Sequence, residues 1–197
     1  MNRTEYFLLL LALGSLWGFF EMISLPVFIL CSIGLLFLFI GRKLVDIPGT
    51  SIIIGLIVCF YKTYGNNFFI CQWAGVMGLA ISFDFYASFI FKSNWQKPII
   101  TSLIGIITNI TSLFIFVFVV VVVFQEPNWL AGGLDRIINY TLYSILPAAI
   151  ISGLLTSHIG SYVGSKLKGL NAVTPKKILP GIYLTATILL WIAASIN

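Results

Sequence analysis

Long apolar runs follow one another along the whole chain, and only short polar connections separate them. An apolar α-helix needs about 20 residues to cross roughly 30 Å of hydrocarbon, and shorter helices suffice when flanking side chains reach the interface. The runs match this length. The sequence therefore predicts an all-α polytopic membrane bundle of six to seven transmembrane helices, with segments at 6–22, 27–40, 51–64, 68–91, 99–124, 137–163 and 178–196.

The composition supports lipid as the solvent of this chain. Hydrophobic residues make up 59% of the 197 positions and charged residues only 9%, which is too few charges for a surface that faces water. The apolar runs leave no room for a separate soluble unit, so we expect a single membrane domain over 1–197. Its six-helix core covers about 6–165, and the helix at 178–196 is an addition. The segments 27–40 and 51–64 are short, and we expect them to be tilted, half-buried or re-entrant.

The first apolar run also resembles a secretory signal peptide. Arg3 precedes the run 7–13, and Ala12-Leu13-Gly14 is a passable cleavage site. However, the apolar character continues through Trp17, Phe19 and Phe20, so the segment is long enough to remain as a span. We favour the span.

Basic residues alternate between the two sides of the membrane once seven crossings are assumed. Lys and Arg gather on the cytoplasmic side of bacterial membrane proteins. One side receives only Lys62 and Arg136. The other receives the remaining nine of the eleven Lys and Arg residues, at positions 3, 42, 43, 92, 97, 166, 168, 176 and 177. This distribution predicts a cytoplasmic amino terminus and an outer carboxyl terminus, in a membrane that we expect to be the bacterial cytoplasmic membrane.

Prolines mark the ends of most segments. Five of them lie at or between the predicted helices, where a missing backbone N–H costs little. Pro147 lies inside the sixth segment, and we expect a kink there, with Ser144 or a neighbouring helix satisfying the freed carbonyl.

Polar and aromatic residues gather at the predicted outer ends of several helices. A charge inside hydrocarbon costs roughly 2.5 to 3.5 kcal/mol on insertion scales, so Glu21 and Lys62 need an explanation. One hypothesis is an outward-facing cup that binds a small molecule. The alternative is an interfacial belt of Trp and Tyr with wetted charges. The residues predicted to line the cup are Trp17, Glu21, Lys62, Asn66, Gln72, Trp73, Asn109, Asn139 and Tyr143.

A second polar group is expected toward the inner ends of the fourth and sixth segments. Asp84 and His158 fall at similar depth and would face each other, either as a structural hydrogen-bonded pair or as a proton relay. Asn109 lies deeper, and we interpret it as a bridge between helices that also reaches a ligand.

No catalytic or cofactor signature accompanies these residues. The sequence has no GxSxG, no HExxH and no phosphate-binding glycine motif, and Cys31, Cys59 and Cys71 have no metal-ligand spacing. The Lys and Arg residues form no basic stripe for nucleic acid. We therefore expect no enzymatic activity, no cofactor and no metal, although an intramembrane enzyme or a proton-linked carrier using Asp84 and His158 stays open.

Pairs of small residues permit close approach of helices, within the bundle or to a partner. They are Gly14/Gly18, Ala74/Gly78, Gly153/Ser157 and Gly160/Gly164.

The chain resembles the substrate-binding S components of energy-coupling factor transporters. The resemblance rests on its length, the cytoplasmic amino terminus, the outward polar mouth and the stretch Leu13-Gly14-Ser15-Leu16-Trp17-Gly18. It implies a non-catalytic subunit that binds a vitamin-like micronutrient from outside, with energy supplied by partner ATPase subunits. In that family a small-xxx-small pattern in the first helix packs on a transmembrane coupling subunit, a role that the resemblance gives to Gly14 and Gly18. A membrane assembly partner without a ligand is the remaining alternative.

Overall fold

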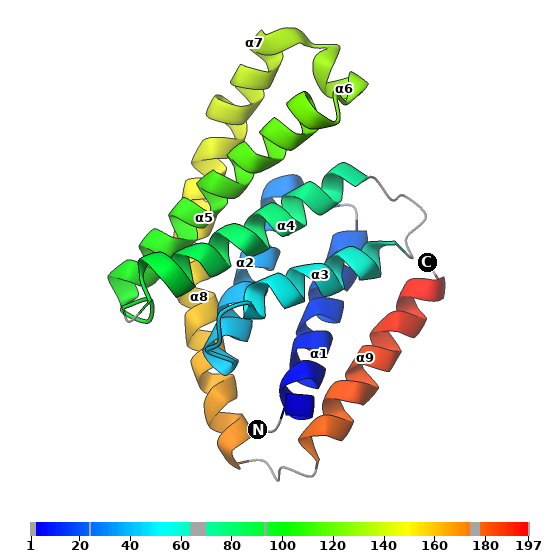
Figure 1. Cartoon of the computed structure of the whole chain (residues 1–197), viewed down its shortest axis with the longest axis vertical. Helices are drawn as coiled ribbons and strands as arrows, with labels where there is room; N and C mark the ends of the chain where they lie inside the picture. The colour runs from blue at the N-terminus through cyan, green and yellow to red at the C-terminus, as the bar shows by residue number, and fades with distance from the viewer. Residues whose placement is uncertain (1–2, 24, 64–69, 93, 174–177, 197) are drawn as a thin grey trace.

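The chain is an all-α bundle, as the sequence predicts. The computed structural model describes residues 3–23, 25–63, 70–92, 94–173 and 178–196 (Figure 1). The elements in these ranges are α1 (Arg3–Met22), α2 (Val27–Leu44), α3 (Thr50–Lys62), α4 (Ile70–Phe85), α5 (Pro98–Phe118), α6 (Pro127–Leu130), α7 (Gly133–Ile138), α8 (Leu146–Val173), α9 (Leu179–Ile196), and the π-helical segments η1 (Tyr86–Ile90), η2 (Val119–Val123) and η3 (Asn139–Ile145).

Within the described residues, five helices are long and apolar enough to cross a membrane. They are Arg3–Met22, Val27–Leu44, Cys71–Ile90, Pro98–Val123 and Gly133–Leu170. Helix α2 continues to Leu44, beyond the end that the sequence predicts, so it is not a short segment. Helix α3, with 13 residues, is short as expected. The apolar stretch of α9 (Leu179–Ser195) is also shorter than the five spanning helices. The chain is thus a helical membrane protein.

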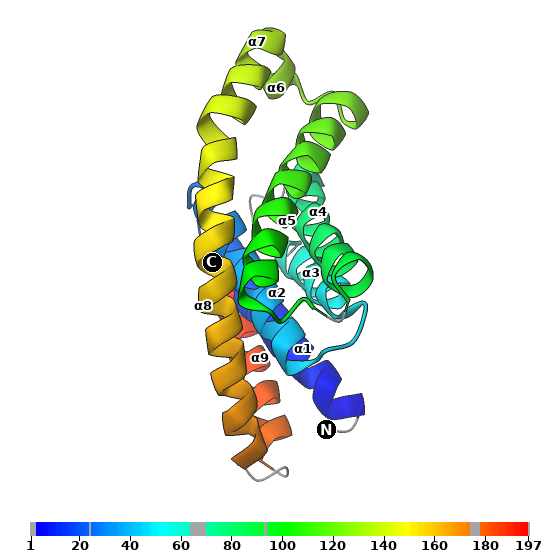
Figure 2. The same ribbon diagram turned by 90° about the vertical axis from the view of Figure 1, so that its left-hand side faces the viewer.

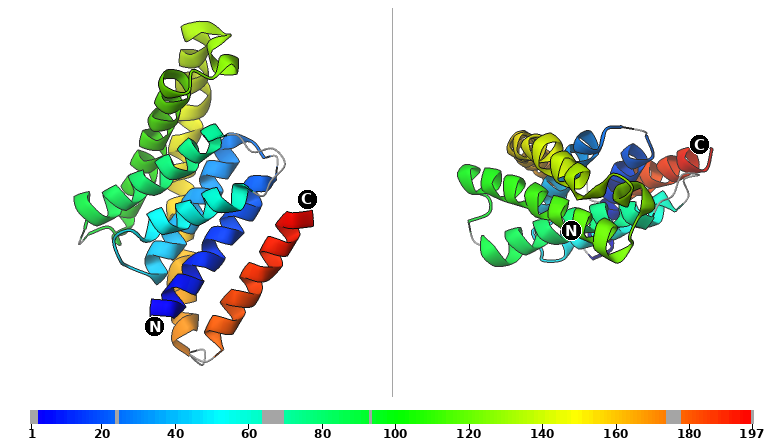
Figure 3. Two further views of the ribbon diagram at one scale, coloured as in Figure 1. Left: turned by 45° about the vertical axis from the view of Figure 1, so that its right-hand side comes forward. Right: turned by 90° about the horizontal axis from the view of Figure 1, so that it is seen from above.

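Helix α2 lies at the centre of the bundle. It packs against α8 along much of its length and also contacts α1, α3 and α4. Helix α8 runs along one side of the molecule (Figure 2), and α5 lies against it. Helix α9 lies beside α1 at the edge of the bundle (Figure 3). The core therefore forms around α2, where the ring of Phe39 meets Phe83 of α4 edge to face at 4.7 Å between centroids.

Small residues bring α2 and α8 together. A Cβ added at Gly160 would come within 2.8 Å of the Phe39 Cβ, and one at Gly164 within 2.7 Å of the Lys43 Cβ. Real Cβ atoms do not approach so closely, so a larger residue at either position would push the helices apart. The pair Gly160/Gly164 therefore serves packing within the chain.

The glycines of α1 are also covered within the chain. A Cβ at Gly14 would lie 2.7 Å from Ile57, and a Cβ at Gly18 would lie 2.7 Å from Tyr61, both in α3. The face that the resemblance assigns to a coupling subunit is thus occupied by α3. Helix α9 packs on the same pair of helices, because Trp191 donates a hydrogen bond to Ser15 and its ring meets Tyr61 edge to face.

Prolines and π-helical segments shape the long helices. Pro26 precedes α2, and Pro98 opens α5, where its missing N–H is unpaired in any case. The irregularity expected near Pro147 takes the form of η3, which ends two residues before this proline. A π-helical turn bonds residues five apart in place of four, so it shifts which side chains face the bundle after it. Residues 133–170 form one continuous helix of 38 residues through this segment.

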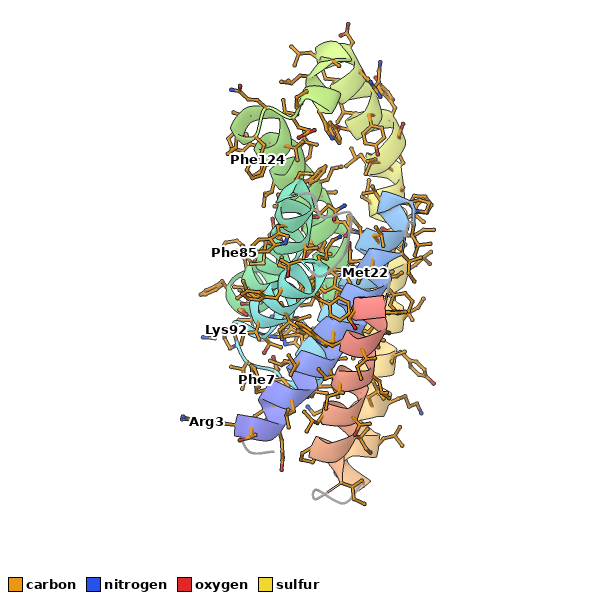
Figure 4. All side chains as sticks on the ribbon, turned by 90° about the vertical axis from the view of Figure 1, so that its right-hand side faces the viewer. Arg3, Phe7, Met22, Phe85, Lys92 and Phe124 are labelled. Carbon is orange, nitrogen blue, oxygen red and sulfur yellow. The ribbon has the colours of Figure 1, made fainter. Side chains whose placement is uncertain are left out.

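Apolar side chains cover much of the outer surface. Arg3 lies toward the lower end in Figure 4, and Phe124 lies in the upper part. Phe7 and Phe85 stand on the outer surface between them, with exposed fractions of 54% and 48%. Large apolar side chains on the outside fit contact with lipid.

Candidate functional site: a pocket between the helix ends

A cavity of about 430 Å³ lies where eight elements meet. Its walls come from the end of α1, the start of α2, the ends of α3 and α4 that face each other, the middle of α5, and the stretch from α6 to the first turns of α8. Pockets of 300 to 1,000 Å³ are typical for small molecules. Of the residues expected to line a cup, five do line this cavity: Trp17, Glu21, Lys62, Gln72 and Asn109.

Glu21 and Lys62 form a buried ion pair in the cavity wall. The Lys62 ammonium donates to Oε2 of Glu21 at 2.7 Å, and only 6% and 8% of the Lys62 and Glu21 side chains are exposed. The indole N–H of Trp17 donates to the other carboxylate oxygen at 3.1 Å. Both carboxylate oxygens therefore have a donor, whereas the ammonium has further protons available. The pair is short and shielded, unlike the wetted interfacial charges of the alternative interpretation.

Helix positions explain why these three side chains meet. Trp17 and Glu21 are one turn apart on α1, so they share a face. Lys62 is the last residue of α3, and α3 packs on α1 through Gly14 and Gly18. The close approach of the two helices carries Lys62 to Glu21, across 41 positions in the sequence.

Asn109 lies on the α5 wall of the cavity and is 2% exposed. Its side-chain N–H₂ donates to the Ala149 carbonyl at 3.0 Å and to the Ser152 hydroxyl at 2.9 Å, both on α8. The side chain therefore bridges two helices, as the sequence predicts. Its carbonyl oxygen Oδ1 has no hydrogen-bond partner among the described residues.

Aromatic rings close the cavity from the side of α6 and η3. The ring of Trp129 meets Phe116 at 5.7 Å and Tyr140 at 5.4 Å between centroids, in both cases edge to face. All three residues line the cavity. Phe116 and Trp129 did not stand out in the sequence, because hydropathy does not tell a cavity-lining aromatic residue from one that faces lipid.

Three residues expected in the cup are placed differently. Asn139 and Tyr143 are exposed, and the cavity is lined by Tyr140 and Ile145 in their place. The five-residue step between Tyr140 and Ile145 follows from the π-helical segment η3, which the sequence pattern did not indicate. Trp73 packs against Phe60 and does not line the cavity. Asn66 lies outside the described residues.

The expected pair of Asp84 and His158 does not form. Asp84 is buried and bonds to Arg42 at 3.4 Å and to the backbone N–H of Gly49 at 2.7 Å. His158 is exposed on α8, and its Nε2 lies 2.8 Å from the hydroxyl of Ser102. Asp84 and His158 thus bond to different partners, which the sequence pattern could not distinguish. The proton relay between them loses its geometric basis.

Asp84 instead belongs to a group of ion pairs and hydrogen bonds that fixes the turn between α2 and α3. Arg42 donates to the Ile47 carbonyl of this turn and pairs with Asp46 at 3.1 Å as well as with Asp84. Gly49 adopts a left-handed backbone conformation with φ of 90°, which glycine favours, and this conformation begins α3. Arg42 is thus shared by two carboxylates, of which Asp84 is buried and Asp46 is partly exposed.

Metal chemistry has no support in the described part of the chain. No group of three or more His, Cys, Asp or Glu side chains in it could hold a metal ion. Cys31 and Cys71 line the cavity, and Cys59 is buried nearby on α3; all three are free thiols.

Comparison of the chain with protein-family models, with curated proteins and with solved structures gives no match.

Proposed function

We propose that this chain is the membrane-embedded binding subunit of an uptake system for a small molecule of the micronutrient kind. The observation that carries the proposal is the cavity of about 430 Å³ whose wall holds the buried Lys62–Glu21 pair. Burying two charges in a membrane bundle is costly unless they are paired and hydrogen-bonded. A site that must orient a ligand gives a reason to keep them.

The proposed side of entry is the outer one. The predicted topology supports it, because nine of the eleven basic residues fall on the side opposite to the ends of α1 and α3. Resemblance to S components supports partner subunits that supply ATP hydrolysis, since this sequence has no phosphate-binding motif of its own. Such partners would dock elsewhere than on Gly14 and Gly18, which α3 covers.

A variant that fills the cavity tests the binding function. Gly75 lines the cavity, and a Cβ there would meet only the Phe116 ring at an ordinary 3.5 Å, so Gly75→Leu adds volume without displacing backbone. We expect a small molecule to co-purify with the native protein in mild detergent and its occupancy to fall about tenfold or more in this variant. Small-molecule mass spectrometry of both preparations measures the occupancy.

The matched control is Gly169→Leu on α8, where an added Cβ meets nothing within 4 Å and the cavity is not involved. The Gly169→Leu protein should bind the co-purified molecule at the same occupancy as the native protein. A native preparation without a bound molecule, or equal occupancy in all three proteins, would remove the basis of the proposal.

Cysteine labelling tests the proposed orientation. Ala131 lies in the turn between α6 and α7, and Gly169 lies near the far end of α8; both are exposed. In a background with Cys31, Cys59 and Cys71 replaced by serine, we expect a membrane-impermeant maleimide to label Ala131→Cys in intact cells. Gly169→Cys should react only after lysis. The reverse pattern would place the amino terminus outside.

A further inference from the structure

We propose that the cavity takes a lipophilic molecule that carries a single uncharged polar group, which binds to the side-chain amide of Gln72. This inference rests on the proposed binding function and adds the chemical class of the ligand. Three features of the cavity carry it. The polar side chains of its α5 and α8 walls are engaged within the protein, its two charges neutralise each other, and its rim is apolar.

The polar side chains of the α5 and α8 walls hold these two helices together. Both protons of the Asn109 amide are used by Ala149 and Ser152 of α8. The Ser112 hydroxyl donates to the Asn109 backbone carbonyl, and the Ser152 hydroxyl donates to the Ala149 carbonyl. The oxygen Oδ1 of Asn109 has almost no accessible surface, so a molecule in the cavity cannot reach it. Toward the cavity, these walls therefore act as largely apolar surface.

The charges of the wall favour a ligand without net charge. Within the described chain, the cavity is lined by one acidic and one basic side chain, Glu21 and Lys62, which pair at 2.7 Å. Lys62 and Trp17 engage both oxygens of Glu21, so the carboxylate has no free oxygen for a cation. An anion would add a negative charge that the balanced pair does not compensate, and an uncompensated charge in a shielded site is costly.

Gln72 is the polar side chain of the wall that stays available to a ligand. It lies in the first turn of α4, lines the cavity and is partly exposed. Its amide has no hydrogen-bond partner among the described residues, and both of its polar atoms are accessible, unlike Oδ1 of Asn109. An amide both donates and accepts, so it suits a hydroxyl, a carbonyl or another amide.

The rim of the cavity is apolar where α1 meets α2. Ile23, Val27 and Phe28 line the cavity, and their exposed fractions are 42%, 48% and 48%. Aliphatic and aromatic residues complete most of the remaining wall, and Trp129 and Tyr140 each add a single polar atom to a large ring. Cavities with apolar walls exclude water and take up apolar molecules. A lipophilic molecule dissolved in the bilayer would meet this rim without crossing water.

The hydrogen bond to Gln72 gives the cavity its advantage over the bilayer. Lipid tails are as apolar as the cavity wall, so an apolar body alone gains little by leaving them. A polar group in hydrocarbon has no hydrogen-bond partner, and the Gln72 amide supplies one. The cavity should therefore prefer a lipophilic molecule with one polar group to one without any.

Two-phase extraction of the native and Gly75→Leu preparations tests the lipophilic character. Bound molecules are released with chloroform, methanol and water, and both phases are analysed by mass spectrometry. We expect the molecule whose occupancy falls in Gly75→Leu to be uncharged and to be recovered in the chloroform phase, in about tenfold or greater excess over the aqueous phase.

Three probes that share one ring system test the polar group. Naphthalene has no polar group, 2-naphthol has one uncharged hydroxyl at neutral pH, and naphthalene-2-sulfonate has a negative charge. Binding is measured by equilibrium dialysis of the protein in phosphatidylcholine nanodiscs and is referred to the probe concentration in the lipid. Nanodiscs with the Gly75→Leu protein are the blank for uptake into lipid. We expect 2-naphthol to bind about tenfold more tightly than either of the other two probes.

The variant Gln72→Leu should bind 2-naphthol and naphthalene equally. Gln96→Leu is the matched control, because Gln96 is exposed, bonds to Asp46 and does not line the cavity. The Gln96→Leu protein should keep the preference for 2-naphthol. If Gln72→Leu does not fold, the comparison of the three probes on the native protein decides alone.

The ligand class is overturned if the molecule that Gly75→Leu loses is recovered in the aqueous phase. It is equally overturned if naphthalene or naphthalene-2-sulfonate binds as tightly as 2-naphthol, if Gln72→Leu keeps the preference, or if none of the probes binds. The proposed function fails by a different result, namely equal occupancy of the co-purified molecule in the native and Gly75→Leu proteins.

Discussion

Replacing Lys62 by methionine is expected to lower the free energy of unfolding by about 3–5 kcal/mol, because the change leaves the carboxylate of Glu21 buried without its partner. The Glu21 side chain is only 8% exposed, so water cannot replace the lost partner. Unfolding in mixed detergent and SDS micelles, followed by circular dichroism, measures the loss.

The double variant Glu21→Gln with Lys62→Met separates the effect of the ion pair on stability from its effect on ligand binding. It removes both charges, and the amide that replaces the carboxylate would keep an oxygen that accepts from Trp17. Replacing a buried pair by groups of similar volume is often neutral for stability, so the double variant should regain most of the loss. If it is no more stable than Lys62→Met alone, or if the single variant is as stable as the native protein, the pair is not shielded as the structure shows. A stable double variant that no longer retains the co-purified molecule would assign the pair to binding.

Gly105→Ala is expected to have an effect of similar size. The added methyl would overlap the Gly153 backbone oxygen and lie 2.9 Å from the Ser157 Cβ, neither of which can turn away as a flexible side chain could. We expect a loss of about 3 kcal/mol, although alanine favours the helix by about 1 kcal/mol over glycine. The shift of α5 away from α8 should also displace Asn109 and reduce the occupancy of the co-purified molecule.

Gly169→Ala is the control for this prediction, since the same substitution on α8 meets nothing within 4 Å. Its stability should be unchanged or slightly raised. Equal stability of the two variants, measured by the same unfolding titration, would contradict the tight crossing of α5 and α8.

The all-α fold and most helix bounds could be predicted from the sequence because each span is a local signal. A run of apolar residues that ends at a proline or a glycine turn needs no information from distant segments. The structure confirms this for α1, which ends at Met22, and for α5, which begins at Pro98. The extra turn of α2 was missed because Arg42 and Lys43 look like residues outside the hydrocarbon, whereas Arg42 is buried by its bonds to Asp46 and Asp84.

The residues of the candidate site could be predicted from the sequence only in part. Glu21 and Lys62 were found because charges in apolar helices are conspicuous, and both line the cavity. The partner of Asp84 was missed because depth along a helix does not reveal the direction in which a side chain points. Tyr143 was placed in the cup because it lies near the predicted outer end of the sixth segment, whereas Tyr140 and Ile145 of the π-helical segment η3 line the cavity. These errors concern contacts between segments, which a single sequence does not encode locally.

The continuous helix of 38 residues from Gly133 to Leu170 determines where the aromatic rings that close the cavity lie relative to the bilayer. At 1.5 Å per residue it is about 57 Å long, whereas the hydrocarbon layer measures about 30 Å. Tilting alone would require about 58°, well outside the usual range of up to about 40°. Part of this helix must therefore project past the acyl chains. If the projecting part is the end that carries α6 and α7, a solute concentrated among the lipid headgroups would meet Trp129 and Tyr140 by diffusing along the membrane surface.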